Sequence, residues 1–199
     1  MSFRKEKKYR LTFSELAILK QKLLNSGMTN LYPPRIVNSC YFDTPELKLF
    51  NESEEGILPR KKIRVRWYDK SSKFTKEVKI SSLEGRFKHQ KKNIKVQNLE
   101  NLLNIKIFDN SYGELMPILN VSYKREYFLF KELRVTFDEN ISYTFLRSIS
   151  KPSYIDNECV MEVKAPINCN DNYIDNLIHY PTTRFSKYAR GCILNYKKI

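Results

Sequence analysis

Arginine and lysine residues recur at alternate positions of several short segments, and this spacing could build an anion-binding surface. In RVRWYD, Val65 separates Arg64 from Arg66. Because side chains alternate between the two faces of a β-strand, the two arginines share one face and Val65 lies on the other. The same alternation recurs in EVKIS at 77–81, LRVTFDENI at 133–141 and MEVK at 161–164. We therefore expect a sheet with one apolar and one cationic face, a surface that attracts polyanions.

Length and charge limit the class of protein. With 199 residues, 41% of them hydrophobic, the chain can bury the core of one domain, and we expect a single domain over residues 1–199. The formal net charge of +14 favours a polyanionic partner, because so many like charges oppose compaction. An ordinary solvated basic surface is the alternative explanation of the charge.

Cysteine and histidine are too few and too scattered for a zinc site or a disulfide framework. Cys40, Cys159, Cys169 and Cys192 show no CxxC spacing, and the chain has only 2 histidines. Free thiols are typical of a reducing compartment. The segment MSFRKEKKYRL lacks the apolar core of a signal peptide, and no run of about 18 apolar residues occurs. We expect a cytoplasmic protein. Location at the inner face of a membrane, through a membrane-protein partner, is left open.

Hydrophobic periodicity and turn residues predict about eight strands and several helices. Thr12 and Glu15 form a capping box that opens a helix, which Gly27 ends. Pro33 and Pro34 predict a loop. We expect strands near 3–11, 35–42, 61–69, 73–80, within 81–95, and near 118–130, 132–138, 141–146 and 158–165, and helices near 13–26, 45–52, 98–104 and in two pieces between 170 and 193.

Most of the strands are joined by connections of hairpin length, which favours an α+β fold with a mainly antiparallel sheet or barrel. In a closed barrel the apolar faces lie outward beneath amphipathic helices, and charged residues line the interior. In a sandwich the charged face is simply solvated. The repeated gathering of cations on one face favours the barrel.

In their order along the chain, the charged segments resemble the VTC domain, the polyphosphate polymerase branch of the triphosphate tunnel enzymes. The resemblance spans nearly the whole chain. It rests on eight segments: KKY at 7–9, YFDTP at 41–45, RVRWYD at 64–69, EVKIS at 77–81, SYKREYF at 122–128, LRVTFDENI at 133–141, MEVK at 161–164 and FSKYARG at 185–191. It implies an eight-stranded antiparallel β-barrel with flanking helices, whose interior is a tunnel for a triphosphate.

The resemblance also implies roles for particular residues. Glu162, with Glu6, would bind a divalent metal, Mn²⁺ or Mg²⁺. Tyr123 and Lys164 would contact substrate, as would a lysine of the run 88–92, for which Lys91 is preferred to Lys88. The cations that hold the triphosphate would be Lys8, Arg64, Arg66, Lys79, Arg125, Arg134 and Lys187.

One position departs from the hydrolytic enzymes of this superfamily, which begin with an ExExK strand whose two glutamates help to bind metal. The equivalent residues here are Arg4, Glu6 and Lys8, so the first acid is missing. This difference disfavours two-metal hydrolysis and favours the polymerase branch. Glu6 leaves a weak triphosphatase activity open.

The implied reaction is transfer of the γ-phosphoryl group of ATP to a growing polyphosphate, with pyrophosphate or triphosphate as further ligands. Fixed cations and a metal stabilise phosphoryl transfer without a covalent intermediate. An inorganic triphosphatase is one alternative. A non-catalytic module that binds polyphosphate, inositol pyrophosphate or RNA is the other. Nucleic acid is disfavoured, because most tyrosines and phenylalanines occupy apolar alternating positions rather than forming exposed stacking platforms.

Overall fold

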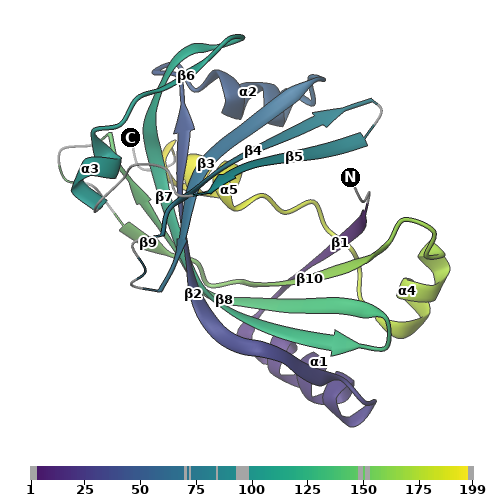
Figure 1. Ribbon diagram of the computed structural model, residues 1–199. Coiled ribbons are helices and arrows are strands. Elements are labelled where there is room, and N and C mark those ends of the chain that lie inside the picture. Colours follow the sequence, from purple (N-terminus) through teal and green to yellow (C-terminus); the bar gives the residue numbers. More distant parts are fainter. Residues whose placement is uncertain are drawn as a thin grey trace. The chain divides into compact units, whose positions relative to one another are not determined.

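The computed structural model describes residues 4–69, 71, 73–83, 85–92, 99–147, 150 and 153–196. Figure 1 shows the strands and helices formed by these residues. The strands are β1 (Arg4–Leu11), β2 (Thr29–Asp43), β3 (Arg60–Tyr68), β4 (Thr75–Ser82), β5 (Gly85–Lys92), β6 (Ile107–Asp109), β7 (Gly113–Phe130), β8 (Leu133–Phe145), β9 (Ser153–Ile155) and β10 (Cys159–Pro166). The helices are α1 (Phe13–Asn25), α2 (Lys48–Glu55), α3 (Leu99–Leu103), α4 (Asp171–Leu177) and α5 (Lys187–Tyr196).

Eight strands form one hydrogen-bonded path, in the order β1-β10-β8-β7-β2-β3-β4-β5. The short strands β6 and β9 pair with β7 and β8 beside this path. Every pairing whose register is described is antiparallel. The predicted α+β fold, with mainly antiparallel strands and flanking helices, is confirmed. The described hydrogen bonds leave β1 and β5 as the two ends of the path, so closure of the eight strands into the predicted β-barrel stays a prediction.

Two compact units make up the chain, each built from segments that are distant in sequence. Unit 1 contains Met1–Arg35, Tyr123–Ile141 and Asp156–Phe185, and unit 2 contains Ile36–Ser122, Ser142–Ile155 and Ser186–Ile199. The single domain over residues 1–199 stays a prediction. No helix within the described ranges is long and apolar enough to cross a membrane.

The core of unit 1 lies between the sheet and α1, which runs along β1, β10 and β8 (Figure 1). Alternate residues of these strands enter this core, among them Tyr9, Val135 and Val163. The predicted capping box starts α1: the Thr12 N–H donates to Glu15 Oε2 at 2.7 Å, and the Glu15 N–H donates to Thr12 Oγ1 at 3.2 Å. The opposite face of the same strands is left for charged side chains.

In unit 2, strand β3 is buried on both faces. Ile63 and Val65 pack in a core with Leu49 of α2 and Leu102 of α3. The residues that alternate with them include Arg64, which is only 9% exposed. Since charged groups are rarely buried unless they are paired, this arginine must have partners on its own face.

Two of the predicted breaks in the chain are absent. The prediction of a loop at Pro33 and Pro34 is wrong, because β2 continues through both residues. They lie in the exposed part of β2, where proline is tolerated because no N–H needs a buried partner. The strands predicted at 132–138 and 141–146 are one strand, β8, in which Asn140 adopts a left-handed φ of 51°. Asparagine tolerates this conformation better than most residues.

Gly191 of α5 lies so close to its neighbours that a larger side chain has no room. A Cβ at this position would lie 2.5 Å from Leu119 Cδ2 and 2.7 Å from Tyr143 Cδ1. We expect Gly191→Ala to lower the free energy of unfolding by about 1–3 kcal/mol through overpacking, measured by urea denaturation. Leu119→Ala in the same background should recover part of this loss relative to the sum of the two single changes. Strictly additive effects would contradict the contact.

Candidate functional site

Five of the predicted site residues share one face of unit 1. Across β1 and β10, Glu6 lies opposite Lys164 and Lys8 lies opposite Glu162. Across β10 and β8, Lys164 lies opposite Arg134. Residues directly opposite each other on antiparallel strands point to the same face of the sheet. The register therefore brings these five side chains together on the face that does not contact α1.

Glu162 is the buried acid at the centre of this face, only 7% exposed. Its Oε1 lies 2.5 Å from Lys164 Nζ, and its Oε2 lies 3.8 Å from an Nη of Arg125. Burial alone would raise the pKa of Glu162, but the positive charges of Lys164, Arg125 and Lys8 outweigh it and hold that pKa well below its usual range. Glu162 is therefore ionised at neutral pH.

Glu6 contacts two of the same cations. Its Oε1 lies 3.2 Å from Lys8 Nζ, and its Oε2 lies 3.8 Å from Lys164 Nζ. Lys8 also donates a hydrogen bond of 3.0 Å to the carbonyl oxygen of Phe185. Both predicted metal ligands, Glu6 and Glu162, therefore contact the ammonium group of Lys164.

Arg125 is held by an acid that the sequence did not single out. Its Nε and one Nη donate to the two carboxylate oxygens of Asp138 at 2.5 and 2.7 Å, and Asp138 is fully buried. The guanidinium group also lies over the ring of Tyr123, 5.2 Å from the ring centre. A bidentate pair of this kind fixes the orientation of Arg125 and offsets much of its charge. Asp138 follows Arg134 by four residues in β8, so the two lie on the same face of the strand. The period-two pattern of LRVTFDENI therefore could have indicated Asp138 as a member of the charged set.

Arg134 differs from Arg125 in its surroundings. Its Nε is buried and has no hydrogen-bond partner among the residues that the structure describes. A buried donor without a partner costs free energy, because it has lost its hydrogen bonds to water. An anion bound at Arg134 Nε would accept the hydrogen bond that no described residue accepts.

In unit 2, Arg64 lies between two strands and bonds to both. Tyr41 of β2 and Glu77 of β4 lie opposite it. Arg64 donates to Glu77 Oε2 from Nε at 2.8 Å and to the Tyr41 hydroxyl from an Nη at 2.9 Å. Arg66 donates to Ser39 Oγ at 3.2 Å and lies 3.8 Å from the same oxygen of Glu77. One buried carboxylate thus holds both predicted arginines.

The cations around Tyr41 change its acidity. Burial alone would raise the pKa of Tyr41, but the charges of Arg64, Arg66 and Lys62 outweigh it and lower that pKa. Lys62 precedes Arg64 by two residues and donates to Ser186 Oγ at 2.8 Å, directly before α5. Lys62 is not among the predicted site residues, although KKIRVR extends the same alternation by one step.

The remaining predicted lysines are less closely defined. Lys79 and Lys187 are partly buried, and Lys79 lies opposite Lys62 across β3 and β4. The side chains of Lys88 and Lys91 lie outside the described residues, but the backbone register pairs Lys88 with Lys79 and Lys91 with Lys76. The register therefore favours position 88 over the predicted Lys91, since position 88 shares the face of Lys79.

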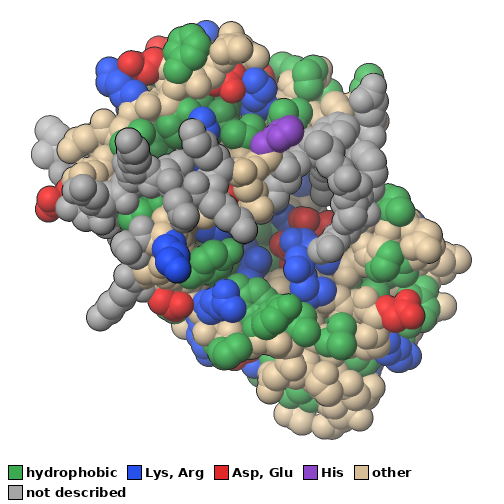
Figure 2. Space-filling model, in the orientation of Figure 1, with side chains coloured by type: hydrophobic (Ala, Val, Ile, Leu, Met, Phe, Trp, Pro, Cys, Tyr) green, Lys and Arg blue, Asp and Glu red, His purple; other side chains and the backbone are tan. Residues whose placement is uncertain are grey.

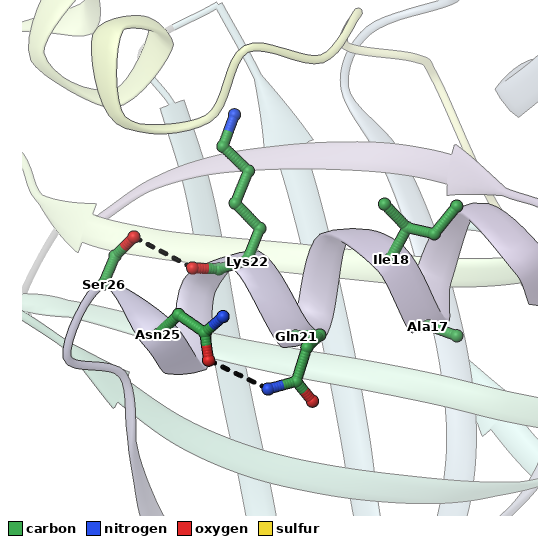
Figure 3. A pocket seen from close by; sticks show the side chains of 6 residues that line it. All are labelled: Ala17, Ile18, Gln21, Lys22, Asn25 and Ser26. Carbon is green, nitrogen blue, oxygen red and sulfur yellow. Dashed lines mark hydrogen bonds between the residues drawn. The ribbon is translucent and has the colours of Figure 1, made fainter.

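The described residues of these faces form no preformed metal cluster. Within the described ranges, no three His, Cys, Asp or Glu side chains gather as a metal site. A depression on the outer face of α1 is lined by Ala17, Ile18, Gln21, Lys22, Asn25 and Ser26, none of them a predicted site residue (Figure 3). Figure 2 shows Lys and Arg side chains interspersed with Asp and Glu on the visible face of the molecule. Pairing of buried acids with cations distinguishes the candidate site.

The pairing of Arg125 predicts a large effect on stability. We expect Arg125→Ala to lower the free energy of unfolding by about 3–5 kcal/mol, because it removes the two charge-assisted hydrogen bonds that the buried Asp138 accepts from Arg125. Arg134→Ala is the matched control and should change stability by less than about 1 kcal/mol. Urea denaturation of both variants at pH 7 measures the difference, and equal effects would contradict the different roles of the two arginines.

The lowered pKa of Glu162 predicts a dependence of stability on pH. In the unfolded chain the pKa of a glutamate is about 4.3, which is above the pKa of folded Glu162. The contribution of Glu162 to the free energy of unfolding is therefore fully present above pH of about 4.3, and it is lost as the pH falls through the folded pKa. We expect Glu162→Gln to flatten the loss of stability below pH of about 4, measured by urea denaturation between pH 7 and pH 2. An unchanged slope would show that Glu162 is not held in its ionised form.

The chain matches the family model described as the VTC domain over residues 3–196. No curated protein sequence matches it. Among solved structures, a Bacillus halodurans protein provisionally described as an adenylate cyclase has a TM-score of 0.59 at 13% identity, covering 93% of this chain and 94% of that one. A Hippeastrum protein described as revealing a dominant triphosphatase activity has a TM-score of 0.54 at 14% identity, covering 94% and 93%. Likeness at such low identity shows the fold alone, whereas the family match covers nearly the whole chain. The chain belongs to the VTC domain family.

Proposed function

We propose that this protein is an ATP-dependent polyphosphate polymerase. A terminal oxygen of the polyphosphate would attack the γ-phosphorus of ATP, the bond from that phosphorus to the β-phosphate would break, and ADP would leave. The observation that carries the proposal is the set of fixed cations on each charged face, with the ionised Glu162 among them. Such an arrangement suits phosphoryl transfer, because preorganised charge stabilises the nonbridging oxygens.

The cations would have two kinds of role. In unit 1, Arg134, Lys8 and Lys164 would contact phosphate oxygens, and Arg125 would be held in place by Asp138. Arg134 is the strongest candidate, because its buried Nε lacks a hydrogen-bond partner among the described residues. In unit 2, phosphate contacts would come from Lys62, Arg64, Arg66, Lys79, Lys187 and a lysine of 88–92.

Glu162 and Glu6 would hold a divalent metal, Mn²⁺ or Mg²⁺. Carboxylate oxygens are ligands that these ions prefer, and Mg²⁺ binds largely through substrate phosphates and waters, so two carboxylates suffice. The residues fit a cation, because the Lys164 ammonium already contacts both carboxylates, at 2.5 Å from Glu162 and 3.8 Å from Glu6. A bound metal would neutralise charge on the phosphates.

An inorganic triphosphatase is the second candidate. It is favoured by Glu6, which lies on the same face as Glu162 and contacts the same lysine. The Hippeastrum protein of similar fold is described as having a dominant triphosphatase activity. Against this candidate, Arg4 stands where the hydrolytic enzymes have their first acid.

The proposal implies a location and partners. A polymerase of this kind would use ATP in the cytoplasm, with pyrophosphate, triphosphate or polyphosphate as acceptor or product. Delivery of the product to a membrane would need a membrane-protein partner. We propose that residues 1–199 act in this reaction as one VTC-type domain.

The products formed from ATP test the proposal. Purified protein is incubated with ATP and Mn²⁺ or Mg²⁺, with and without pyrophosphate, and a gel separates long polyphosphate from free phosphate. We expect long chains and ADP. Phosphate without chains would indicate the triphosphatase, and unchanged ATP together with a melting shift in tripolyphosphate would indicate a binding module.

Variants in the same assay test the residues. Glu162→Gln, Lys187→Ala and Arg134→Ala should each lower chain synthesis at least about 100-fold, the typical scale for losing one fixed stabilising group. Lys22→Ala, on the exposed outer face of α1, removes a positive charge elsewhere and should leave synthesis unchanged. If Glu162→Gln and Lys187→Ala both retain full synthesis, the proposed site is wrong.

A further inference from the structure

The segment YFDTP contains a fully buried acid, Asp43, that the proposed chemistry does not use. Its Oδ1 accepts hydrogen bonds from the N–H groups of Thr44 at 2.7 Å and Leu49 at 2.9 Å. Its Oδ2 accepts from the N–H of Phe50 at 2.9 Å and from the hydroxyl of Tyr188. With four donors around it, Asp43 is a structural anchor rather than a surface acid.

Two of these donors belong to the first turn of α2, whose N–H groups have no partner within the helix. The residue before α2, Leu47, has a left-handed φ of 58° and makes no side-chain cap. Asp43 instead caps Leu49 and Phe50, and Thr44 Oγ1 accepts from the Lys48 N–H at 3.1 Å. The acid and the threonine of YFDTP therefore replace the ordinary cap of α2.

The fourth donor, Tyr188, belongs to the first turn of α5 and is 2% exposed. Its ring stacks on that of Tyr41, with ring centres 4.8 Å apart and planes inclined by 14°. It also meets the edge of Phe50 of α2, with ring centres 6.3 Å apart. The hydroxyl and the ring of Tyr188 thus contact residues of β2 and α2 within unit 2.

Tyr188 is also close to two of the predicted cations of unit 2, Arg64 and Lys187. The Tyr41 hydroxyl accepts a hydrogen bond from Arg64, so the tyrosine against which Tyr188 stacks also binds that guanidinium group. Lys187 directly precedes Tyr188 at the start of α5. Tyr188 is therefore linked to Arg64 through Tyr41 and to Lys187 through the backbone of α5.

We propose that Asp43 and Tyr188 are positioning residues, which fix α5 against β2 and thereby set the placement of Arg64 and Lys187 for an anionic ligand. The inference rests on the proposed function in one respect, namely that this ligand carries phosphate groups. A purely structural pair would stabilise the fold without affecting the ligand.

Tyr188→Phe tests the inference, because it keeps the stacked ring and removes only the hydroxyl. We expect the dissociation constant for tripolyphosphate, measured by calorimetry well below the melting temperature, to rise about tenfold, which corresponds to about 1.4 kcal/mol. Asp43→Asn should have a similar effect, and the double variant should add little to either change. Tyr112→Phe is the matched control: its hydroxyl also donates to an acid of α2, Glu52, and its removal should leave binding unchanged.

A second measurement is independent of ligand. The Arg64 Nε–H, which is buried and donates to Glu77, should shift and exchange faster with solvent in Tyr188→Phe than in wild type, as measured by NMR. The backbone amides of Leu49 and Phe50 should remain protected in Tyr188→Phe but exchange faster in Asp43→Asn.

The outcomes separate the two proposals. If wild type does not bind tripolyphosphate, the proposed function fails, and the Arg64 signal alone decides the positioning role. Unaltered Arg64 exchange in Tyr188→Phe overturns that role. It is also overturned if both variants lose stability yet bind tripolyphosphate as wild type does, because the pair is then purely structural.

Discussion

Repulsion between positive charges on one sheet face is the constraint on which both units depend. Two like charges about 4 Å apart repel by about 4 kcal/mol at an effective dielectric constant near 20. In unit 2 a single buried carboxylate, Glu77, lies against both Arg64 and Arg66. In unit 1 Asp138 holds Arg125 through two hydrogen bonds, and Glu162 contacts Lys164. These buried acids allow several cations to occupy buried or half-buried positions on one face, and they fix the orientation of the cations that they contact.

The pairing also divides the cations by role. Arg125 has its charge offset and its geometry fixed, which suits a group that shapes the site. Arg134 keeps a buried donor without a partner among the described residues, which suits a group that awaits an anion. Lys164 is intermediate, since it contacts Glu6 and Glu162 and can offer its charge to a ligand only in competition with them. Residues that look equivalent in a sequence motif therefore differ in how far acids of the protein already pair with their charge and their N–H donors.

How far the sequence predicts this structure depends on the range of each interaction. The capping box of Thr12 and Glu15 was predicted because both partners lie within one helical turn. The bond between Asp43 and Tyr188 was not, because its partners are 145 residues apart and nothing local indicates the pairing. Position 88 shows the intermediate case: the basic run was visible, but only the register of β4 and β5 distinguishes it from position 91. The appended strands β6 and β9 were missed, since segments so short carry no periodic pattern.

The sequence by itself determined which residues can share a face, because alternation is a property of a single strand and needs no partner. It thereby indicated the antiparallel α+β fold, the charged faces and the order of segments typical of the VTC domain family. Only the tertiary structure decided which acid neutralises which cation, that Asp43 caps α2 and holds Tyr188, and that Arg134 differs from Arg125. Strand register and burial decide such pairings, and both arise from contacts between segments that lie far apart in the chain.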